Sequence, residues 1–381
     1  MTSKSRVPIV QRVRHTGSRA TLVAPKAVTV TAAATVTVVI PCYNYGRYLP
    51  AAVASVTGQE GVSVDVIIVD DASTDSSADV AAALVAHDPR IRLIAHERNR
   101  GHIVTYNDGL NAANGEYCVL MSADDLLAPG ALNRATSVMQ AEPTVGMVYG
   151  TAVPFTDVPP ATLATVQAWG LWAGADWLAL RCERAVNTIR SPEVVVRTSI
   201  QRIAGGYRAD LPQTADHEMW MRLASLADVG RVIGPDQAYY RVHGMNMHSE
   251  IFAAGTGDGM LIDLRNRLLV FEAWQEWMAT RGRPCAELVD CARRSLARES
   301  LVLACRAYRW GHVNVWPVEA LRQFAAETYV DAQKLPEWRK LDRYGRVGVR
   351  KSRWYPRFVF ADQVDMGQRR LTVVRERWTG V

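Results

Sequence analysis

The sequence predicts an α/β fold in which strands and helices alternate around a mostly parallel sheet. Short apolar runs of strand length recur roughly every 25 to 30 residues in the first third of the chain. Alanine-rich or amphipathic stretches of helix length separate them. Strands that alternate with helices in this way pair in parallel through right-handed crossovers. The chain has 381 residues, of which 49% are hydrophobic, so it can form one large or two modest domains.

The expected elements follow in chain order. Apolar runs bounded by turn residues predict buried strands at residues 36–40, 64–69, 91–95 and 117–121. Helices are expected between them at residues 48–57, 76–87 and 103–114. After residue 150 the pattern loosens, and we expect a helix around 172–182, a strand at 194–196, a helix at 216–226 and a strand at 238–242. From about residue 260, apolar residues at helical spacing predict packed helices rather than a site.

The charge is unevenly distributed along the chain. Residues 1–36 contain six Lys or Arg and no acid, and residues 335–381 contain twelve Lys or Arg and five acids. This distribution sets apart a flexible basic segment (1–35) and a basic tail (335–381). Between them, the change of pattern separates an α/β domain (36–250) from a helical region (251–334). In the tail, aromatic residues including Trp338 and Trp354 alternate with arginines, which suits peripheral contact with an anionic membrane. A solvated tail is the simpler interpretation.

Cysteine usage and hydropathy indicate the compartment. The six cysteines form no CxxC pair, and three lie in apolar segments, so we expect reduced core residues in a cytoplasmic protein. No apolar stretch approaches the roughly 18 to 20 residues that span a bilayer. The N-terminus also lacks the apolar core of a signal peptide. Any membrane association is expected to be peripheral, at the inner face.

Two adjacent acids, Asp124 and Asp125, follow the fourth expected strand in the run Ser122-Ala123-Asp124-Asp125. Carboxylates at the end of a buried strand are costly unless they bind something positive. In open α/β sheets, ligands lie just outside the carboxyl ends of the strands. The pair is therefore suited to a divalent cation, which in turn can hold a diphosphate. The alternative is that the second Asp caps the following segment.

Polar loops follow the first two strands as well, as Pro41-Cys42-Tyr43-Asn44 and Asp70-Asp71-Ala72-Ser73. All three loops should emerge at one edge of the sheet, where a nucleotide would bind. Tyr43 could stack on a base, and a carboxylate of the second loop could accept a hydrogen bond from it. The chain has neither GxGxxG nor GxxxxGK[ST], so neither a dinucleotide site nor a P-loop is indicated.

These motifs together resemble the family 2 glycosyltransferases, which have the GT-A fold. The resemblance covers about residues 36–150. The matching motifs are Val38-Val39-Ile40-Pro41-Cys42-Tyr43-Asn44, Val69-Asp70-Asp71-Ala72-Ser73-Thr74-Asp75, Asn99-Arg100-Gly101, Asn114-Gly115-Glu116-Tyr117 and Ser122-Ala123-Asp124-Asp125.

The resemblance implies a nucleotide-sugar donor, with UDP the commonest nucleotide, and a divalent cation, Mn²⁺ or Mg²⁺. By the family pattern Asp71 is the carboxylate that binds the base, Asp124 faces the ribose or sugar, and Asp125 is a metal ligand. Pro41, Tyr43, Asn44 and Arg100 lie in the other donor-binding motifs. The acceptor is expected to be a glycan, a lipid-linked molecule or a small molecule, and no nucleic acid is expected.

Three later motifs extend the resemblance. Gly205-Gly206-Tyr207 looks like the glycine-rich loop near the donor sugar and acceptor. The segment 215–222 resembles the acidic segment that supplies the catalytic base, although its first acid is replaced by Ala215 and the second, Asp216, is retained. Tyr240-Arg241-Val242-His243 resembles the motif whose His can join the metal. The processive motif Gln-x-x-Arg-Trp is absent from the expected region.

The expected reaction is the inverting transfer of a single sugar, assisted by the metal. Asp216 is expected to take the proton of an acceptor hydroxyl as it attacks the anomeric carbon. Glu218 would point to another side of a helix, but the two acids could exchange roles if the segment were extended. Two other functions remain open: a nucleotidyltransferase that makes an activated sugar, and a non-catalytic scaffold that binds a sugar nucleotide.

Overall fold

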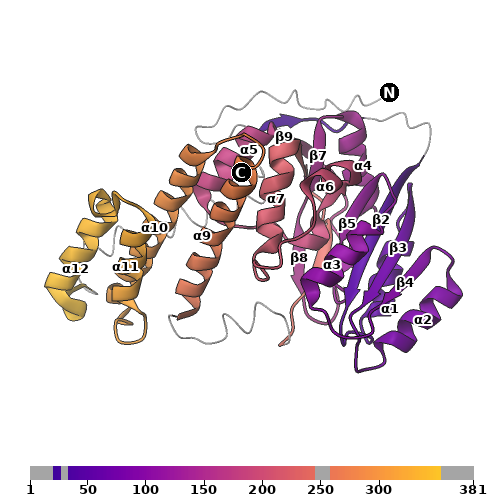
Figure 1. The fold of residues 1–381 in the computed structure, drawn as a ribbon, viewed down its shortest axis with the longest axis horizontal. Helices are drawn as coiled ribbons and strands as arrows, with labels where there is room; N and C mark the ends of the chain where they lie inside the picture. Colours follow the sequence, from indigo (N-terminus) through magenta and orange to yellow (C-terminus); the bar gives the residue numbers. More distant parts are fainter. Residues whose placement is uncertain (1–19, 27–32, 245–257, 353–381) are drawn as a thin grey trace, which may run out of the picture.

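A nine-stranded sheet forms the centre of the computed structural model, which describes residues 20–26, 33–244 and 258–352. The strand order is β1-β9-β11-β7-β10-β5-β2-β3-β4 (Figure 1). Strands β2, β3, β4 and β5 are parallel to one another, whereas β10 runs antiparallel to both of its neighbours. The strands are β1 (Thr21–Val23), β2 (Ala34–Cys42), β3 (Val62–Asp70), β4 (Ile91–Ala95), β5 (Tyr117–Leu120), β7 (Val145–Tyr149), β9 (Ala168–Trp172), β10 (Val195–Arg197) and β11 (Asp228–Ile233).

Helices cover both faces of this sheet because the strands are apolar on both sides, as expected for a parallel sheet. On one face, β2 packs against the apolar sides of α1 and α4. On the other face, Val39 of β2 joins a core with α3, α5 and α7. The helices are α1 (Leu49–Thr57), α2 (Ser77–His87), α3 (His102–Asn111), α4 (Ala131–Ala141), α5 (Gly174–Arg184), α6 (Thr198–Ala204) and α7 (Ala215–Leu226).

A second sheet of three strands lies beside the end of β5. It consists of β6 (Leu126–Leu127), β12 (Ala238–Arg241) and β8 (Ala152–Phe155), with β12 in the middle. Pairing of β6 with β12 sets Tyr239 opposite Leu126. This pairing brings the end of β12 beside the Asp124-Asp125 turn, more than a hundred residues away in the sequence.

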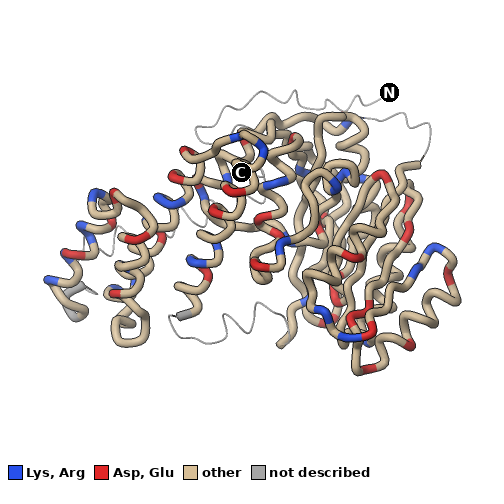
Figure 2. The backbone as a smooth tube through the Cα atoms, viewed as in Figure 1, with Lys and Arg blue, Asp and Glu red and all other residues tan. Residues whose placement is uncertain are grey.

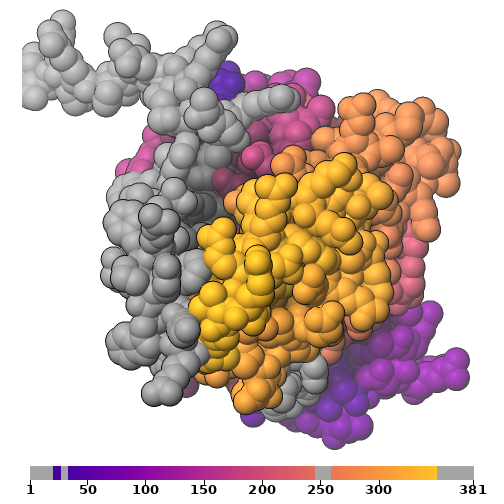
Figure 3. All heavy atoms as spheres, turned by 90° about the vertical axis from the view of Figure 1, so that its left-hand side faces the viewer, coloured from indigo at the N-terminus to yellow at the C-terminus, as the bar shows by residue number. Residues whose placement is uncertain are grey.

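The C-terminal helices pack against the sheet domain through α5 and α7. They are α9 (Asp258–Ala279), α10 (Ala286–Trp310), α11 (Val318–Thr328) and α12 (Pro336–Ser352). α9 contacts α7 and α10 contacts α5, so their apolar stripes extend the core on that face of the sheet. Helices α10 to α12 form one continuous face of the molecule (Figure 3, orange to yellow).

The sequence-based fold class is confirmed. The four strands expected first, which are β2 to β5, and the helices α1 to α3 lie within two or three residues of their expected positions. The expected helix around 172–182 begins later, because Trp172 ends β9 and α5 starts at Gly174. Five of the six cysteines are buried, and all six are free thiols.

Two expectations about the ends of the chain were wrong in part. Within the segment expected to be flexible, β1 pairs antiparallel with β9. Three residues are too few to show a period, and the pairing partner is distant in sequence. The expected basic tail begins with α12, in which Leu341 and Tyr344 are buried. Trp338 is half-buried and packs against the same core, and membrane contact of the tail stays a prediction. Trp354, Tyr355 and Phe358 lie outside the described residues.

Candidate active site

The carboxyl ends of β2, β3 and β5 meet at one edge of the sheet, as the sequence predicted. Acidic residues gather at this edge, at the lower end of β2 and β3 in Figure 2. The expected residues Pro41 and Tyr43 follow or end β2, Asp71 follows β3, and Asp124 follows β5. Parallel pairing therefore brings together donor-site candidates that are widely separated in the sequence.

Asp124 and Asp125 are buried in a tight turn, and the second sheet holds them there. Their exposed fractions are 4% and 2%. The backbone N–H of Arg241 donates to Oδ1 of Asp125 at 2.9 Å, and its Nε donates to the carbonyl of Asp124 at 3.0 Å. His243 Nε2 lies 2.9 Å from Oδ2 of Asp124. The structure thus pairs His243 with Asp124 directly, while its proposed partner in metal binding is Asp125.

The environment of Asp125 is suited to a cation. Burial and the neighbouring charge of Asp124 raise the pKa of Asp125 well above its usual value. The hydrogen bond from the Arg241 N–H and the charges of Arg190 and Arg241 lower this pKa in part. Two adjacent buried carboxylates repel each other unless a positive ion lies between or beside them. Within the described residues, no three His, Cys, Asp or Glu side chains form a metal-binding group. Metal binding by Asp125 and His243 stays a prediction, in which substrate phosphates and water would supply the remaining ligands.

A third carboxylate, Asp216, acts on the same group of tyrosines as the Asp124-Asp125 turn. Burial raises the pKa of Tyr106, and the negative charges of Asp216, Asp124 and Asp125 raise it further. Burial also raises the pKa of Tyr240, with the same three carboxylates contributing. Carboxylates from α7 and from the end of β5 thus converge around tyrosines of α3 and β12.

Asp216 lies in the first turn of α7, half-buried. Its Oδ1 accepts a hydrogen bond from the backbone N–H of His217 at 2.7 Å, and its Oδ2 accepts one from the side-chain amide of Asn187 at 2.9 Å. An acid in the first helical turn is also favoured by the helix dipole. Asn187 therefore fixes the rotamer of the expected base.

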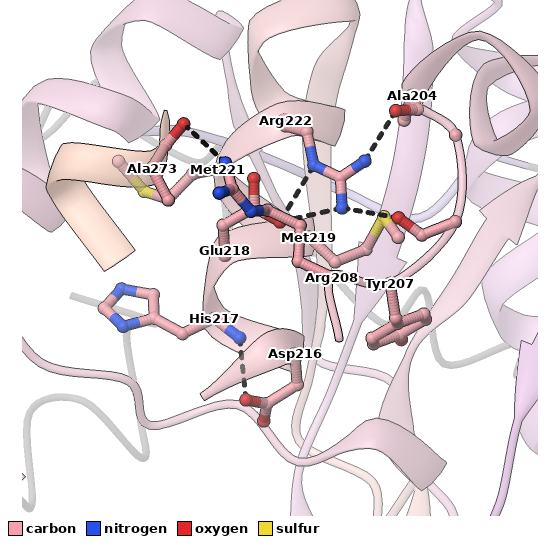
Figure 4. Close-up of polar contacts among 12 residues, drawn as sticks. Ala204, Tyr207, Arg208, Asp216, His217, Glu218, Met219, Met221, Arg222 and Ala273 are labelled. Carbon is pink, nitrogen blue, oxygen red and sulfur yellow. Dashed lines mark hydrogen bonds and ion pairs between the residues drawn. The ribbon is translucent and has the colours of Figure 1, made fainter. Parts of the chain in front are cut away.

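Glu218 points away from Asp216, toward Arg222 (Figure 4). Glu218 is completely buried, and Arg222 Nη2 lies 2.7 Å from its Oε2. Burial raises the pKa of Glu218, and the charge of Arg222 opposes this. Because the segment is helical, the exchange of roles that an extended segment would have allowed does not arise, and Glu218 is a structural residue.

Arg222 uses its remaining N–H groups to hold the glycine-rich loop, by donating to the carbonyls of Ala204 and Gly206. On the other side, Asn107 of α3 both donates to the Tyr207 carbonyl at 2.9 Å and accepts from the Tyr207 N–H at 2.7 Å. A Cβ on Gly206 would lie 2.8 Å from the Asn107 side chain, so the close approach needs glycine. The loop is thus held between α3 and α7.

Asp71 and Asn44 both organise neighbouring loops. Asp71 is 3% exposed, and its carboxylate accepts hydrogen bonds from the Arg100 N–H at 2.8 Å, the Gly101 N–H at 2.9 Å and His96. Burial alone would raise the pKa of Asp71, but these hydrogen bonds lower it below its usual value. Asn44, at φ +60°, accepts from the N–H groups of Thr74 and Asp75.

The side chains of Tyr43 and Arg100 are the most accessible of the expected donor-binding residues. Tyr43 is 45% exposed, which leaves its ring available for stacking. Arg100 directs its guanidinium to Asp108 at 2.6 Å. The Asp71 carboxylate orders the backbone beside Arg100, and its contact with a base stays a prediction.

Sequence reasoning missed several residues that the structure brings to the site. Asn187 and Arg190 belong to a loop without a motif, and Asn107 lies in the middle of a helix. Only His96 could have been found, because it directly follows β4 at the same edge of the sheet as the predicted loops. It bridges Asp71 and Asp108.

Residues 37–193 match the sequence profile of "Glycosyl transferase family 2". This part of the chain is therefore similar to the family 2 glycosyltransferases. The match includes the donor-side motifs and ends before the segment that carries Asp216 and His243.

Curated relatives match part of the chain. Succinoglycan biosynthesis protein ExoO of Rhizobium meliloti is 41% identical over 99 residues, which cover 26% of this chain and 28% of that protein. The uncharacterized glycosyltransferase alr2836 of Nostoc is 37% identical over 114 residues, 30% of this chain and 35% of that protein. The chain thus aligns with only about a third of the length of these relatives.

Two solved structures share the fold over most of both chains. Residues 1–349 of S. aureus TarS superpose with a TM-score of 0.53 at 16% identity, covering 87% of this chain and 88% of that one. The mannosyltransferase PcManGT of Pyrobaculum calidifontis, in complex with GDP-Man and Mn²⁺, gives a TM-score of 0.52 at 20% identity, covering 88% and 90%. The chain therefore has the GT-A fold of these two proteins, with a helical C-terminal region. Among its described helices, none combines the length and apolar character needed to cross a membrane.

Proposed function

We propose that this glycosyltransferase transfers one sugar from a nucleotide-sugar donor to an acceptor hydroxyl, with inversion and with the help of a divalent cation, in glycan biosynthesis. The observation that supports the proposal is the buried Asp124-Asp125 turn at the carboxyl edge of the sheet, with Asp216 of α7 near enough to raise the pKa of the same tyrosines, Tyr106 and Tyr240. The relative ExoO is a succinoglycan biosynthesis protein, which supports a glycan product. UDP is the proposed donor nucleotide, and PcManGT, solved with GDP-Man and Mn²⁺, keeps GDP as the alternative.

The residues of the site divide the work of the reaction. Tyr43 offers an exposed ring to the base, and the loops ordered by Asn44 and Asp71 surround the nucleotide. Asp216, oriented by Asn187, accepts the proton of the acceptor hydroxyl as that oxygen attacks the anomeric carbon. A Mn²⁺ or Mg²⁺ ion held by Asp125 and His243 would offset the charge on the leaving nucleoside diphosphate. Attack from the face opposite this leaving group inverts the anomeric centre.

Melting experiments test donor and metal binding. The wild-type protein is heated with UDP, GDP, dTDP and CDP, each with and without Mn²⁺. A nucleotide at about 100 times its Kd stabilises the folded state by about 2.7 kcal/mol. We expect one nucleotide to raise Tm only with metal, and Asp125→Asn to abolish this rise. Asp290→Asn, on the exposed side of α10, is the matched control. No rise with any nucleotide would contradict the proposal.

A transfer assay tests the base. With the nucleotide sugar identified by melting, Asp216→Asn should retain the metal-dependent rise in Tm but lose about 10² to 10⁴ in kcat, the usual contribution of a general base. Asp290→Asn should keep wild-type turnover. Turnover at the wild-type rate in Asp216→Asn would refute the assignment of the base.

A further inference from the structure

A cavity of about 140 Å³ is lined by residues of α5, β7, β8 and β11 and of the segment before β10. Four arginines line it: Arg181 and Arg184 from α5, Arg190 from the loop before β10, and Arg231 from β11. Glu193 is the only acidic residue in its lining. We call it the arginine cavity. None of the motifs in the sequence includes these arginines.

Two of the four arginines, Arg181 and Arg231, carry a buried donor that the described residues do not satisfy. Arg181 is 3% exposed and donates to the hydroxyls of Thr188 and Tyr149, while its buried Nε has no hydrogen-bond partner. Arg231 lies over the Tyr149 ring, 5.6 Å from the centroid, and its Nε is likewise buried without a partner. In the described part of the chain, neither guanidinium forms an ion pair with a carboxylate. Buried cations with unsatisfied donors are costly unless an anion binds them.

The segment from Asn187 to Glu193 connects the arginine cavity to the catalytic carboxylates. Asn187 donates to Asp216, and Arg190 lies 4.7 Å from the centroid of the Tyr240 ring, close enough to Asp125 to lower its pKa in part. Thr188 and Glu193 of the same segment line the cavity. An acceptor must lie next to the base, so a cavity that shares this segment is on the acceptor's side.

The volume limits what can bind there. About 140 Å³ is close to the size of a cavity that holds one benzene molecule. Pockets for drug-sized ligands are about 300 to 1,000 Å³. The arginine cavity is therefore too small for a nucleoside but can hold one phosphate or carboxylate group of a larger molecule. Arginine binds such groups through two parallel hydrogen bonds.

We propose that the arginine cavity binds a phosphate or carboxylate group of the acceptor, so that the acceptor of this transferase is an anionic sugar or glycan. This inference rests on the proposed function, since it assigns the acceptor of that reaction. It adds a substrate class that the donor-side motifs leave open.

Equilibrium dialysis with radiolabelled inorganic phosphate, at constant ionic strength, tests the site. We expect wild-type protein to bind one phosphate per chain, and Arg184→Gln/Arg231→Gln to bind it about tenfold or more weakly. Arg202→Gln, whose guanidinium binds the Ala113 carbonyl elsewhere, should match wild type. Melting and circular dichroism check folding, and single Arg184→Gln replaces the double variant if that variant does not fold. No binding to wild type, or equal binding to the cavity variants, would overturn the proposal.

Competition then separates acceptor from donor. We expect glucose 1-phosphate and glucuronate to displace the bound phosphate and methyl glucoside to leave it in place. Phosphate should stay bound when UDP or GDP saturates the protein with Mn²⁺. Displacement by UDP-glucuronate but not by UDP-glucose would place the anion on the donor sugar and overturn the acceptor assignment. Phosphate binding in a protein that binds no nucleotide would refute the proposed function and leave the anion site standing.

Discussion

Replacing Arg222 by Met tests whether Arg222 is needed to offset the buried negative charge of Glu218. Glu218 is completely buried, and Arg222 is 3% exposed. Met fills a similar volume and favours a helix, but it leaves Glu218 without its cation and the carbonyls of Ala204 and Gly206 without a donor. Breaking one half of a buried ion pair costs about 3 to 5 kcal/mol. We expect Arg222→Met to lose this much in free energy of unfolding at about pH 7.5.

The loss should shrink as the pH falls. Without Arg222, the pKa of Glu218 rises further in the folded protein, whereas the unfolded chain keeps the ordinary value. The folded variant then binds a proton that the unfolded chain does not, so its stability increases toward low pH. Each pH unit is worth at most about 1.4 kcal/mol, so the variant should recover up to about 2.7 kcal/mol between about pH 7.5 and about pH 5.5.

Urea unfolding followed by tryptophan fluorescence measures these differences. Arg222→Met/Glu218→Gln carries no buried charge, so it should be more stable than Arg222→Met at about pH 7.5 and show no recovery at about pH 5.5. The control is Arg202→Met, which loses one carbonyl contact and should cost about 1 kcal/mol. A deficit of Arg222→Met that is equal at both pH values, or a double variant as unstable as the single one, would refute the reasoning.

Three further variants test other parts of the site. Asn107→Ala removes both hydrogen bonds to the Tyr207 backbone, so it should lower the unfolding free energy by about 1 to 3 kcal/mol and reduce transfer; unchanged Tm and kcat would contradict this role. Burial raises the pKa of Glu193 to about 7 from 4.5. As the pH rises from about 4.5 to about 7, the free energy of unfolding of wild type should therefore fall by up to about 3 kcal/mol relative to that of Glu193→Gln. Equal dependence of the two unfolding free energies on pH would contradict this prediction. Asp71→Asn places an amide N–H opposite a backbone N–H, so the hydrogen bond between them is lost. The Kd for the nucleotide, measured by calorimetry, should then rise about tenfold. An unchanged Kd would show that the loop does not need the carboxylate.

Much of the donor side could be predicted because its signals are local. Strands β2 to β5 are apolar runs with turn residues at their ends, and parallel pairing then puts their carboxyl ends at one edge. Asp71, Asp124 and Asp125 were found in this way, since each follows a strand directly. Whether Asp71 touches a base depends on how its oxygens are engaged, and three donors from residues 96–101 engage them. Those partners belong to another loop, so the sequence around Asp71 does not indicate them.

By itself the sequence determined the alternating α/β order, the acidic edge of the sheet and the helical placement of Asp216, because each depends on the periodicity or residue types of one short segment. Only the tertiary structure decided that His243 contacts Asp124, that Arg222 holds the carbonyls of Ala204 and Gly206, and that arginines from α5, β11 and the loop before β10 line one cavity. These contacts depend on the pairing of β6 with β12 and the packing of helices onto the sheet. Non-local pairings of this kind are set by the packing of the whole core, which no single segment encodes.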